Sequence, residues 1–273
     1  MKRITFSFLF VFPAFAFAQT LQTDIANAEK NFAAYSVQNG TRAAFLKFAD
    51  ANGIVFEKGK PVNAIETWSK RTSAPGILNW RPIYALTAAS GELGFTTGPW
   101  TFQPKSIQDS IVARGQYSTI WHKTPTGEWK FLLDMGVGDT PAFDSLVIAA
   151  DEKNFGFTPG SIEDLQKAED DFIRNTSDPT SRRKAYVDAV SENTFLLNRN
   201  GQLPTISIDK IGVLMQSMPD TITYKLLGSG IAKSGDFGYV YGSAIDNDKE
   251  SNYLRVWRKE NKTWKLVLEV LQY

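Results

Sequence analysis

Residues 90–98 read SGELGFTTG, and residues 234–242 read SGDFGYVYG. Both copies share a Ser-Gly pair, an acidic residue and two later glycines that enclose a short stretch containing an aromatic residue. A glycine inside a strand permits the bend or bulge that a curled sheet needs, so we interpret these later glycines as determinants of sheet shape. They are Gly94, Gly98, Gly238 and Gly242. None of them opens a helix with the spacing of a phosphate-binding loop.

The repeated phrase belongs to a longer duplication. Four further blocks recur in the same order: 28–32 (AEKNF) with 168–172 (AEDDF), 55–56 (VF) with 196–197 (LL), 117–123 (YSTIWHK) with 253–259 (YLRVWRK), and 129–130 (WK) with 264–265 (WK). The offset between partners stays between 135 and 144 residues, which indicates duplication of a whole domain rather than a solenoid. We therefore predict a first domain at residues 19–149 and a second, divergent copy at 158–273, joined by a linker near 149–159.

The first eighteen residues have the pattern of a cleaved export signal. Lys2 and Arg3 form a basic head, residues 4–15 are almost wholly apolar, and residues 16–18 (AFA) give the small-x-small pattern of a signal peptidase site. A membrane anchor is the alternative, but the apolar run is shorter than the roughly 20 residues of a spanning helix. We expect a signal peptide at 1–18, cleavage after Ala18, and a periplasmic or extracellular protein that makes no membrane contact afterwards.

Composition excludes several kinds of function. After cleavage the chain would carry 28 basic and 29 acidic residues, so the basic surface of a nucleic-acid-binding protein is missing. The absence of cysteine excludes disulfides, thiolate nucleophiles and cysteine metal sites. A hydrophobic content of 42% and an aromatic content of 13% are sufficient to fill the cores of two domains.

In each half of the chain, helical spacing of apolar residues comes first and alternation follows. A first helix is predicted around 21–32, with a counterpart around 162–172 that has Ser161 and Asp164 placed as a capping box. Further helices are expected from near residue 41, at 63–70 and at 206–216, and strands at 78–89, 92–102, 115–123 and 128–135. This order predicts an α+β fold in which helices cover one face of an antiparallel sheet.

Several motifs of the first copy point to a known family. They are LxWxP at 78–82, the phrase at 90–98, YxxxWxK at 117–123 and GxWK at 127–130 followed by Asp134. Together they resemble the nuclear transport factor 2-like superfamily, which includes ketosteroid isomerase and the SnoaL-like polyketide cyclases, and more closely its uncharacterised, often secreted branch. In the second copy the resemblance thins to the GYxxG and WRK phrases.

The resemblance implies two tandem cone-shaped domains, each a strongly bent antiparallel sheet wrapped around N-terminal helices, with a pocket at the open end. It also implies that two such cones pair through their sheets. Ile120, Leu254 and Val256 would make the outer sheet faces partly apolar. We therefore expect an intramolecular pseudo-dimer of the two domains.

The general base of ketosteroid isomerase is missing from both copies. Residues 48–51 (FADA) are similar to the phrase that precedes that base in the family, but the matched positions of the base hold Phe56 and Leu197. Glu57 is adjacent, yet the next residue on a strand points to the other face. We expect Asp50 to end or cap its helix.

Metal, cofactor and triad chemistry have little support. His122 is the only histidine, and we expect a polar surface or inter-domain role for it because no nucleophile motif accompanies it. The acidic stretch 246–250 lacks the glycine and the spaced glutamate of a calcium loop, so we interpret it as a solvated hairpin loop. No metal and no cofactor are predicted.

An aromatic pocket with few polar groups remains the best candidate site. Its predicted ligand-binding residues are Trp80, Tyr84, Trp100, Tyr117 and Trp121 in the first copy, and Tyr241, Tyr253 and Trp257 in the second. Asp134 and Glu269, late in the last strand of each copy, are the candidate buried acids. Plain core packing is the alternative for each aromatic residue.

Two classes of function stay open on the sequence. The first is an exported binding or interaction protein that takes a small apolar or aromatic ligand and has no identifiable catalytic machinery. The second is a lyase, isomerase or cyclase that uses Asp134 or Glu269 as a general acid or base. The absent base and the near-neutral surface favour the first class.

Overall fold

The computed structural model describes residues 14–142 and 158–273. The predicted linker near 149–159 therefore lies almost wholly outside the described residues, and so does most of the predicted signal peptide. Helix α1 (Ala14–Asn39) begins before the predicted cleavage point and continues past it. Within the described ranges, no helix is long and apolar enough to cross a membrane.

The first domain places its helices before most of its strands. Its elements are α1, α2 (Thr41–Phe48), β1 (Ala49–Glu57), β2 (Lys60–Asn63), α3 (Ala64–Lys70), β3 (Ile77–Trp80), β4 (Tyr84–Thr87), β5 (Leu93–Gln103), β6 (Ala113–Lys123) and β7 (Trp129–Gly138). The sheet has the order β2-β1-β7-β6-β5-β3, with β4 also paired to β5. Strands β1 and β7 are parallel, and β5, β6 and β7 are antiparallel neighbours.

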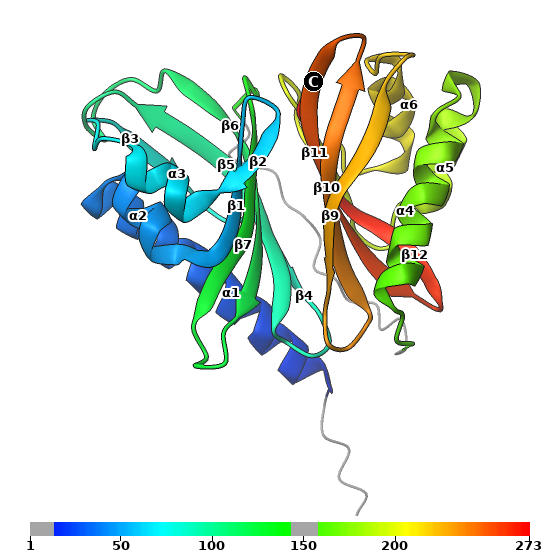
Figure 1. Cartoon of the computed structure of the whole chain (residues 1–273), viewed down its shortest axis with the longest axis horizontal. Coiled ribbons are helices and arrows are strands. Elements are labelled where there is room, and N and C mark those ends of the chain that lie inside the picture. Colours follow the sequence, from blue (N-terminus) through cyan, green and yellow to red (C-terminus); the bar gives the residue numbers. More distant parts are fainter. Residues whose placement is uncertain (1–13, 143–157) are drawn as a thin grey trace, which may run out of the picture.

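The second domain repeats this order with fewer strands. Its elements are α4 (Ile162–Thr176), α5 (Pro179–Ala189), β8 (Leu196–Arg199), α6 (Ile208–Gln216), β9 (Thr223–Ile231), β10 (Phe237–Asp246), β11 (Lys249–Glu260) and β12 (Thr263–Leu271). The sheet order β8-β12-β11-β10-β9 corresponds to β1-β7-β6-β5-β3, and β8 is again parallel to the last strand. The α+β class with two tandem, helix-covered curved sheets is confirmed (Figure 1).

One predicted strand is two strands in the structure. The segment 78–89 divides into β3 and β4 because Pro82, between them, has no N–H to donate to β5. Its two neighbours keep contact with that strand: the Arg81 N–H donates to Pro99 O at 3.3 Å, and the Ile83 N–H donates to Thr97 O at 2.9 Å. The sheet edge is therefore bent at this point rather than lost.

The expectation that Asp50 ends or caps a helix is wrong. Helix α2 ends at Phe48, and Asp50 belongs to strand β1, which the alternation pattern did not reveal. One carboxylate oxygen accepts from the Asn52 N–H at 2.9 Å, and the other lies 2.8 Å from His122 Nε2. Asp50 thus ties the start of β1 to β6.

Glycines at the same position of the repeated phrase allow close approach of the neighbouring backbone. A β-carbon added at Gly98 would lie 2.0 Å from Arg81 O, and one added at Gly242 would lie 2.1 Å from Lys225 O. At Gly242 the register between β9 and β10 also shifts, as in a β-bulge. Glycine is therefore required here by the curvature of the sheet.

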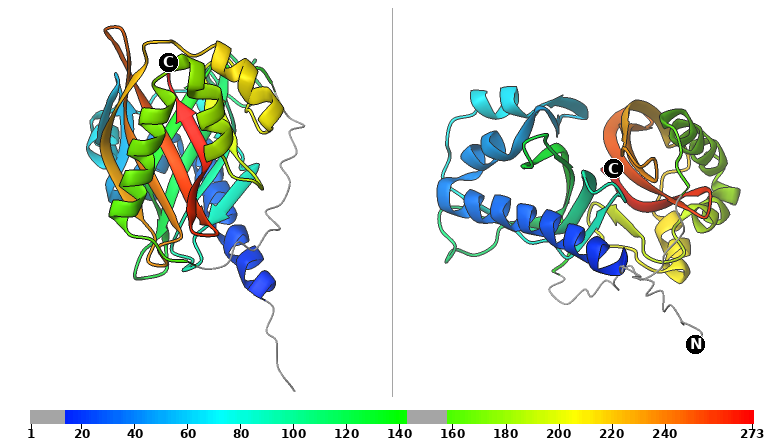
Figure 2. Two further views of the ribbon diagram at one scale, coloured as in Figure 1. Left: turned by 90° about the vertical axis from the view of Figure 1, so that its right-hand side faces the viewer. Right: turned by 90° about the horizontal axis from the view of Figure 1, so that it is seen from below.

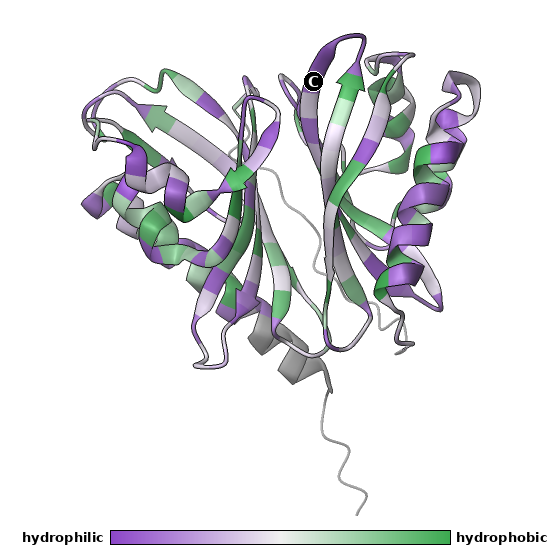
Figure 3. Cartoon of the chain, in the orientation of Figure 1, coloured by the Kyte–Doolittle hydropathy of each residue, from purple (hydrophilic) through white to green (hydrophobic). Residues whose placement is uncertain are grey.

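Three hydrophobic clusters organise the molecule. One lies between helices and sheet in the first domain and includes Phe32 and Trp121, and a second has the same place in the second domain and includes Phe172 and Trp257. The third lies between the two sheets and contains residues of both domains. The sheets accordingly lie back to back in the centre of the molecule, with the helices on the outside (Figures 1 and 2). Figure 3 shows hydrophobic residues along these central strands.

The turns that contain the repeated phrase meet between the two sheets. The Lys233 N–H donates to Glu92 Oε1 at 2.7 Å, and the Ala89 N–H donates to Asp236 Oδ2 at 3.1 Å. Ala89 and Lys233 hold the same position, directly before the serine of each repeated phrase, and Glu92 and Asp236 both lie two residues after that serine. The contact is thus reciprocal between the two copies.

Candidate functional site

A cavity of about 270 Å³ opens inside the first domain. It is lined by Phe45, Leu78, Trp80, Trp100, Tyr117, Asp134, Gly136, Val137 and Gly138. Four of these residues, from strands β3, β5, β6 and β7, are among the predicted site residues: Trp80, Trp100, Tyr117 and Asp134. The curved sheet brings together side chains that the sequence spreads over 55 positions, because neighbouring strands direct alternate residues into the cone.

Asp134 is the acidic group in the cavity wall. It faces Thr119 on β6, whose hydroxyl donates to Asp134 Oδ2 at 2.8 Å. Burial, followed by the nearby Glu29 carboxyl, raises the pKa of Asp134 to about 7, although the hydrogen bond from Thr119 opposes the rise. The side chain is partly exposed toward the cavity. Near neutral pH it is therefore a mixture of acid and carboxylate.

Two glycines keep the space beside Asp134 open. Gly136 and Gly138 follow at alternate positions of β7, so they share the inner face and place no side chain there. An added β-carbon at Gly138 would meet no atom within 4 Å, which confirms that this space is empty. The cavity volume is therefore a product of this Asp-x-Gly-x-Gly pattern.

The aromatic wall is fixed by its own polar contacts. Trp100 Nε1 donates to Val137 O at 3.1 Å, and Trp80 Nε1 donates to Glu29 Oε1 at 2.5 Å. The Tyr117 hydroxyl is buried and makes no well-formed hydrogen bond among the described residues. Burial and the Glu29 carboxyl raise the pKa of Tyr117 well above its usual value, so it stays a neutral phenol. The Thr96 hydroxyl opposes this rise as a weak hydrogen-bond partner. A buried phenol whose hydrogen bonding is incomplete is a group that a ligand would satisfy.

Glu29 is a central residue that the sequence analysis did not single out. It comes from α1, is fully buried, and accepts hydrogen bonds from Trp80, from the Thr96 hydroxyl and from Trp121 Nε1 at 2.8 Å. Burial raises the pKa of Glu29, although these donors favour its charged form. The signal was present in the repeat, where the AE of 28–32 recurs as the AE of 168–172.

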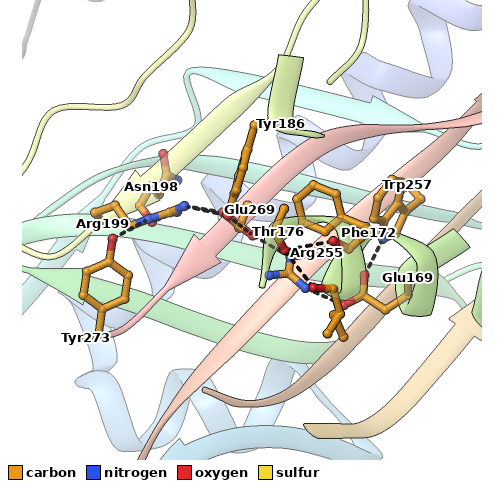
Figure 4. Close-up of polar contacts among 11 residues, drawn as sticks. Glu169, Phe172, Thr176, Tyr186, Asn198, Arg199, Arg255, Trp257, Glu269 and Tyr273 are labelled. Atoms are coloured by element: carbon orange, nitrogen blue, oxygen red, sulfur yellow. Dashed lines mark hydrogen bonds and ion pairs between the residues drawn. The ribbon is translucent and has the colours of Figure 1, made fainter. Parts of the chain in front are cut away.

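The second domain fills the corresponding interior with charged side chains. Glu269 accepts from Arg255 Nε at 2.5 Å and also pairs with Arg199, and Arg255 Nη1 reaches Glu169 at 2.5 Å (Figure 4). Exposure of all four side chains is 1% or less. Burial by itself would raise the pKa of Glu269, but the two guanidinium groups outweigh it and hold that pKa at about 2. Glu269 is therefore a permanent anion that solvent does not reach.

Aromatic rings surround the guanidinium of Arg255. Its central carbon lies 4.4 Å from the ring centroid of Tyr224, 4.5 Å from that of Tyr253 and 4.8 Å from that of Phe172. These are cation–π distances. Tyr253, a predicted ligand-binding residue, thus contacts a side chain of its own domain.

Like Tyr253, four further predicted ligand-binding residues lie outside the cavity. Tyr84 and Tyr241 belong to the cluster between the sheets, and Tyr241 contacts Phe56 with ring centroids 6.0 Å apart. Trp121 and Trp257 are buried core residues whose indole N–H groups donate to Glu29 and Glu169. For these four, core or interface packing is the observed role, because a single sequence does not reveal which face of a curved sheet is hollow.

The other residues discussed in the sequence analysis, Phe56, Leu197 and His122, pack against or pair with side chains of the protein itself. Phe56 packs against the cluster between the sheets, and Leu197 is fully buried in the second core. His122 pairs with Asp50, whose charge also acts on Tyr239 of the second domain. In the residues that the structure describes, no group of three or more His, Asp or Glu side chains is arranged to hold a metal ion.

Two larger hollows lie on the surface at equivalent places of the two copies. One, of about 540 Å³, is bordered by α4, α5 and Trp264, and the other, of about 400 Å³, by α1 and Trp129. Both are lined largely by charged and polar side chains. In the larger one, Asp171 pairs with Lys167 on its own helix. The cavity at Asp134 is the better candidate site, because its wall is mainly apolar and contains a single acid whose pKa burial raises.

Comparison with known proteins finds no matching family model and no matching curated protein. The solved structures that the chain is similar to include nuclear transport factor 2-like proteins. One, from Salmonella enterica, is 14% identical with a TM-score of 0.34 and covers 47% of this chain and 96% of its own. Another, of unknown function from Shewanella oneidensis, is 11% identical with a TM-score of 0.33 and covers 40% and 99%.

A designed protein with a curved β-sheet is a third similar structure. It is 15% identical, with a TM-score of 0.34, and covers 39% of this chain and 97% of its own length. Each of the three matches spans less than half of the chain. At these identities and scores the likeness says nothing about activity.

Proposed function

We propose that the first domain binds a small organic molecule in the cavity lined by Trp80, Trp100, Tyr117 and Asp134. One observation carries this proposal: an acid with a pKa of about 7 lies in the wall of a mainly apolar cavity that two glycines keep open. Apolar walls with a few polar groups are typical of small-molecule sites. The second domain, whose equivalent acid is sealed by two arginines, acts as a structural partner.

Proton transfer is a second candidate for the same site. A general acid or base is most effective when its pKa lies near the working pH, and the pKa of Asp134 meets this condition. Glu269 does not, because it is fully buried and its pKa is about 2. A lyase, isomerase or cyclase reaction would therefore depend on Asp134 alone.

We also propose that the protein acts outside the cytoplasm. The support is the basic head, apolar run and AFA motif of residues 1–18. Export and ligand binding together describe an extracytoplasmic binding protein.

The binding proposal is tested by filling the cavity. Gly138→Leu places a side chain in space that is empty, whereas Gly138→Ala adds only a methyl group. Binding of indole and 4-methylphenol is measured by isothermal titration calorimetry and by ligand-observed NMR. We expect both probes to bind the wild type and the alanine variant, and to lose at least tenfold in affinity with the leucine variant. Equal affinity in all three proteins would refute the proposal, and so would a wild type that binds neither these probes nor a cationic probe of similar size.

A further inference from the structure

The interiors of the two domains share one framework of contacts. Trp121 Nε1 donates to Glu29 at 2.8 Å, and Trp257 Nε1 donates to Glu169 at 3.0 Å. The tryptophans also meet equivalent phenylalanines edge to face: Phe32 at 5.9 Å and 85°, and Phe172 at 5.5 Å and 79°. Positions inside one cone can therefore be compared directly with positions inside the other.

Within this framework, Arg255 occupies the place of Thr119. Thr119 is the cross-strand partner of Asp134, and Arg255 is the cross-strand partner of Glu269. The guanidinium of Arg255 extends between Glu169 and Glu269 and is bound by both. The interior of the second domain is thus a complete cation-binding site, and the cation that fills it is the guanidinium of Arg255.

The first domain keeps the surroundings of that site but has no such cation. Glu29 corresponds to Glu169, and Asp134 corresponds to Glu269. Among the described residues, Asp134 has Thr119 as its hydrogen-bond partner, and no cationic side chain contributes to its electrostatic environment. The pKa of Asp134 is raised by burial and by a negative neighbour, and no positive charge opposes this rise. A carboxylate in this position lacks the partner that buried charges normally have.

The aromatic walls correspond as well. Tyr117 is the counterpart of Tyr253 in the repeat. Trp80 is the cross-strand partner of residue 100 on β5, just as Tyr224 is the partner of residue 244 on β10. In the second domain the corresponding rings, Tyr224 and Tyr253, contact the guanidinium; in the first, Trp80 and Tyr117 line the open cavity. Arg81 is the basic side chain whose charge acts on Tyr117, where it favours the ionised phenol.

We infer that the cavity of the first domain takes a small organic cation, a guanidinium or primary ammonium group attached to a flat apolar body. Its charged group lies beside Asp134 and against the faces of Trp80 and Tyr117, as the Arg255 guanidinium does among the corresponding residues. Its apolar body extends along Trp100 and the open strip at Gly136 and Gly138. Cation–π contacts and a charge-assisted hydrogen bond supply the selectivity. This inference rests on the proposed function of the cavity as a small-molecule site.

The test compares two probes of the same shape that differ in charge. Phenylguanidinium is cationic and phenylurea is its neutral counterpart, and both are titrated calorimetrically at pH 8, where Asp134 is mostly ionised. We expect the wild type to bind phenylguanidinium at least tenfold more tightly than phenylurea. Asp134→Asn keeps the shape of the site and should abolish this preference by weakening only the cation.

A second variant builds the internal cation into the first domain. Thr119→Arg copies the residue found at position 255. Because the new guanidinium should pair with Asp134 inside the cavity, we expect this variant not to bind phenylguanidinium. Its thermal midpoint should be unchanged or higher than that of the wild type. Thr119→Val is the control that removes the hydroxyl without adding charge. If Thr119→Arg fails to fold, the Asp134→Asn comparison decides the question by itself.

The outcomes separate this inference from the proposed function. If phenylurea, indole and 4-methylphenol bind the cavity but the wild type binds phenylguanidinium no more tightly than phenylurea, the cation inference is wrong and the small-molecule site stands. A cation preference that survives in Asp134→Asn also overturns the inference. If no probe binds the wild type, both proposals are wrong.

Discussion

Ser90 and Ser234 are hydrogen-bonded to each other between the two domains, with 2.7 Å between their hydroxyl oxygens. Each hydroxyl also accepts the backbone N–H of the other serine at 3.2 Å. The two residues occupy the same position in the repeated phrase, so each copy contacts the other through the equivalent residue, as across a two-fold axis. Each copy thus contributes the same hydroxyl and backbone N–H to the contact, which gives the repetition of Ser-Gly-acid a physical reason beyond the curvature of the sheet.

The contact between the sheets leads to a prediction about separated domains. Phe95 and Phe237 stack between the sheets with centroids 6.3 Å apart and an angle of 15°, and both are fully buried. A separated domain would expose this apolar face, so fragments 19–149 and 158–273 should associate when mixed. Analytical ultracentrifugation measures this association, and Phe237→Asp should weaken it by at least tenfold. Two well-folded fragments that stay monomeric at micromolar concentration would show that the domains are independent.

Asp134 should make stability depend on pH near neutrality. Between about pH 4 and pH 7 the folded protein holds a proton on Asp134 that the unfolded chain has released, so the free energy of unfolding falls as the pH rises through this window. Asp134→Asn removes this dependence and should be more stable than the wild type at pH 8 by about 1–3 kcal/mol, with little difference at pH 4. Urea unfolding at both pH values measures it. A constant difference across the range would contradict the raised pKa.

The equivalent substitution in the second domain should have the opposite effect. Glu269→Gln leaves Arg199 and Arg255 buried without their shared anion and should cost about 3–5 kcal/mol at pH 7. In the wild type, the stability that Glu269 provides should be lost as the pH falls from about 5 toward 2, because its pKa lies below that of the unfolded chain. Asp188→Asn, which breaks an exposed pair with Lys184, is the control and should change stability by less than about 0.5 kcal/mol. A loss from Glu269→Gln no larger than that of the control would argue against the network.

The chain should not isomerise a Δ5-ketosteroid. Phe56 and Leu197 hold the matched base positions, and neither carries a proton-accepting group. The spectroscopic assay for the conjugated product should show no turnover above the uncatalysed rate. Turnover that is lost in Asp134→Asn would instead favour the proton-transfer function over simple binding.

Export should leave a chain that begins at Gln19. The AFA motif at residues 16–18 places the expected cleavage there. The intact mass of protein recovered from the periplasmic or secreted fraction measures the new terminus directly. A mass that includes residues 1–18 would refute the expected cleavage.

The sequence predicted the order of helices and strands well, but it predicted the interruptions of individual strands poorly. Helix α4 begins at Ile162 behind the expected capping box: the N-cap Ser161 Oγ accepts from the Asp164 N–H at 3.2 Å, and the Ser161 N–H donates to Asp164 Oδ2 at 3.1 Å. Periodicity also found the long strands β5, β6 and β7. It missed β1, where the inward and outward residues do not alternate because a register shift interrupts the pairing with β7.

For the candidate site, the sequence by itself identified the types of residue involved and the correspondence between the two copies. Residue type and spacing named Asp134, Trp80, Trp100 and Tyr117 among the candidates, but five of the eight aromatic residues named with them lie outside the cavity, because alternation on a strand does not say which face of a curved sheet is hollow. The repeat also placed Glu29 opposite Glu169 and Thr119 opposite Arg255, although nothing in one sequence says that these pairs matter. Only the tertiary structure decided that one cone is open and the other is sealed. That difference depends on volume and long-range contact: whether a guanidinium fills the space between two buried carboxyls is settled by packing across strands and helices far apart in the chain.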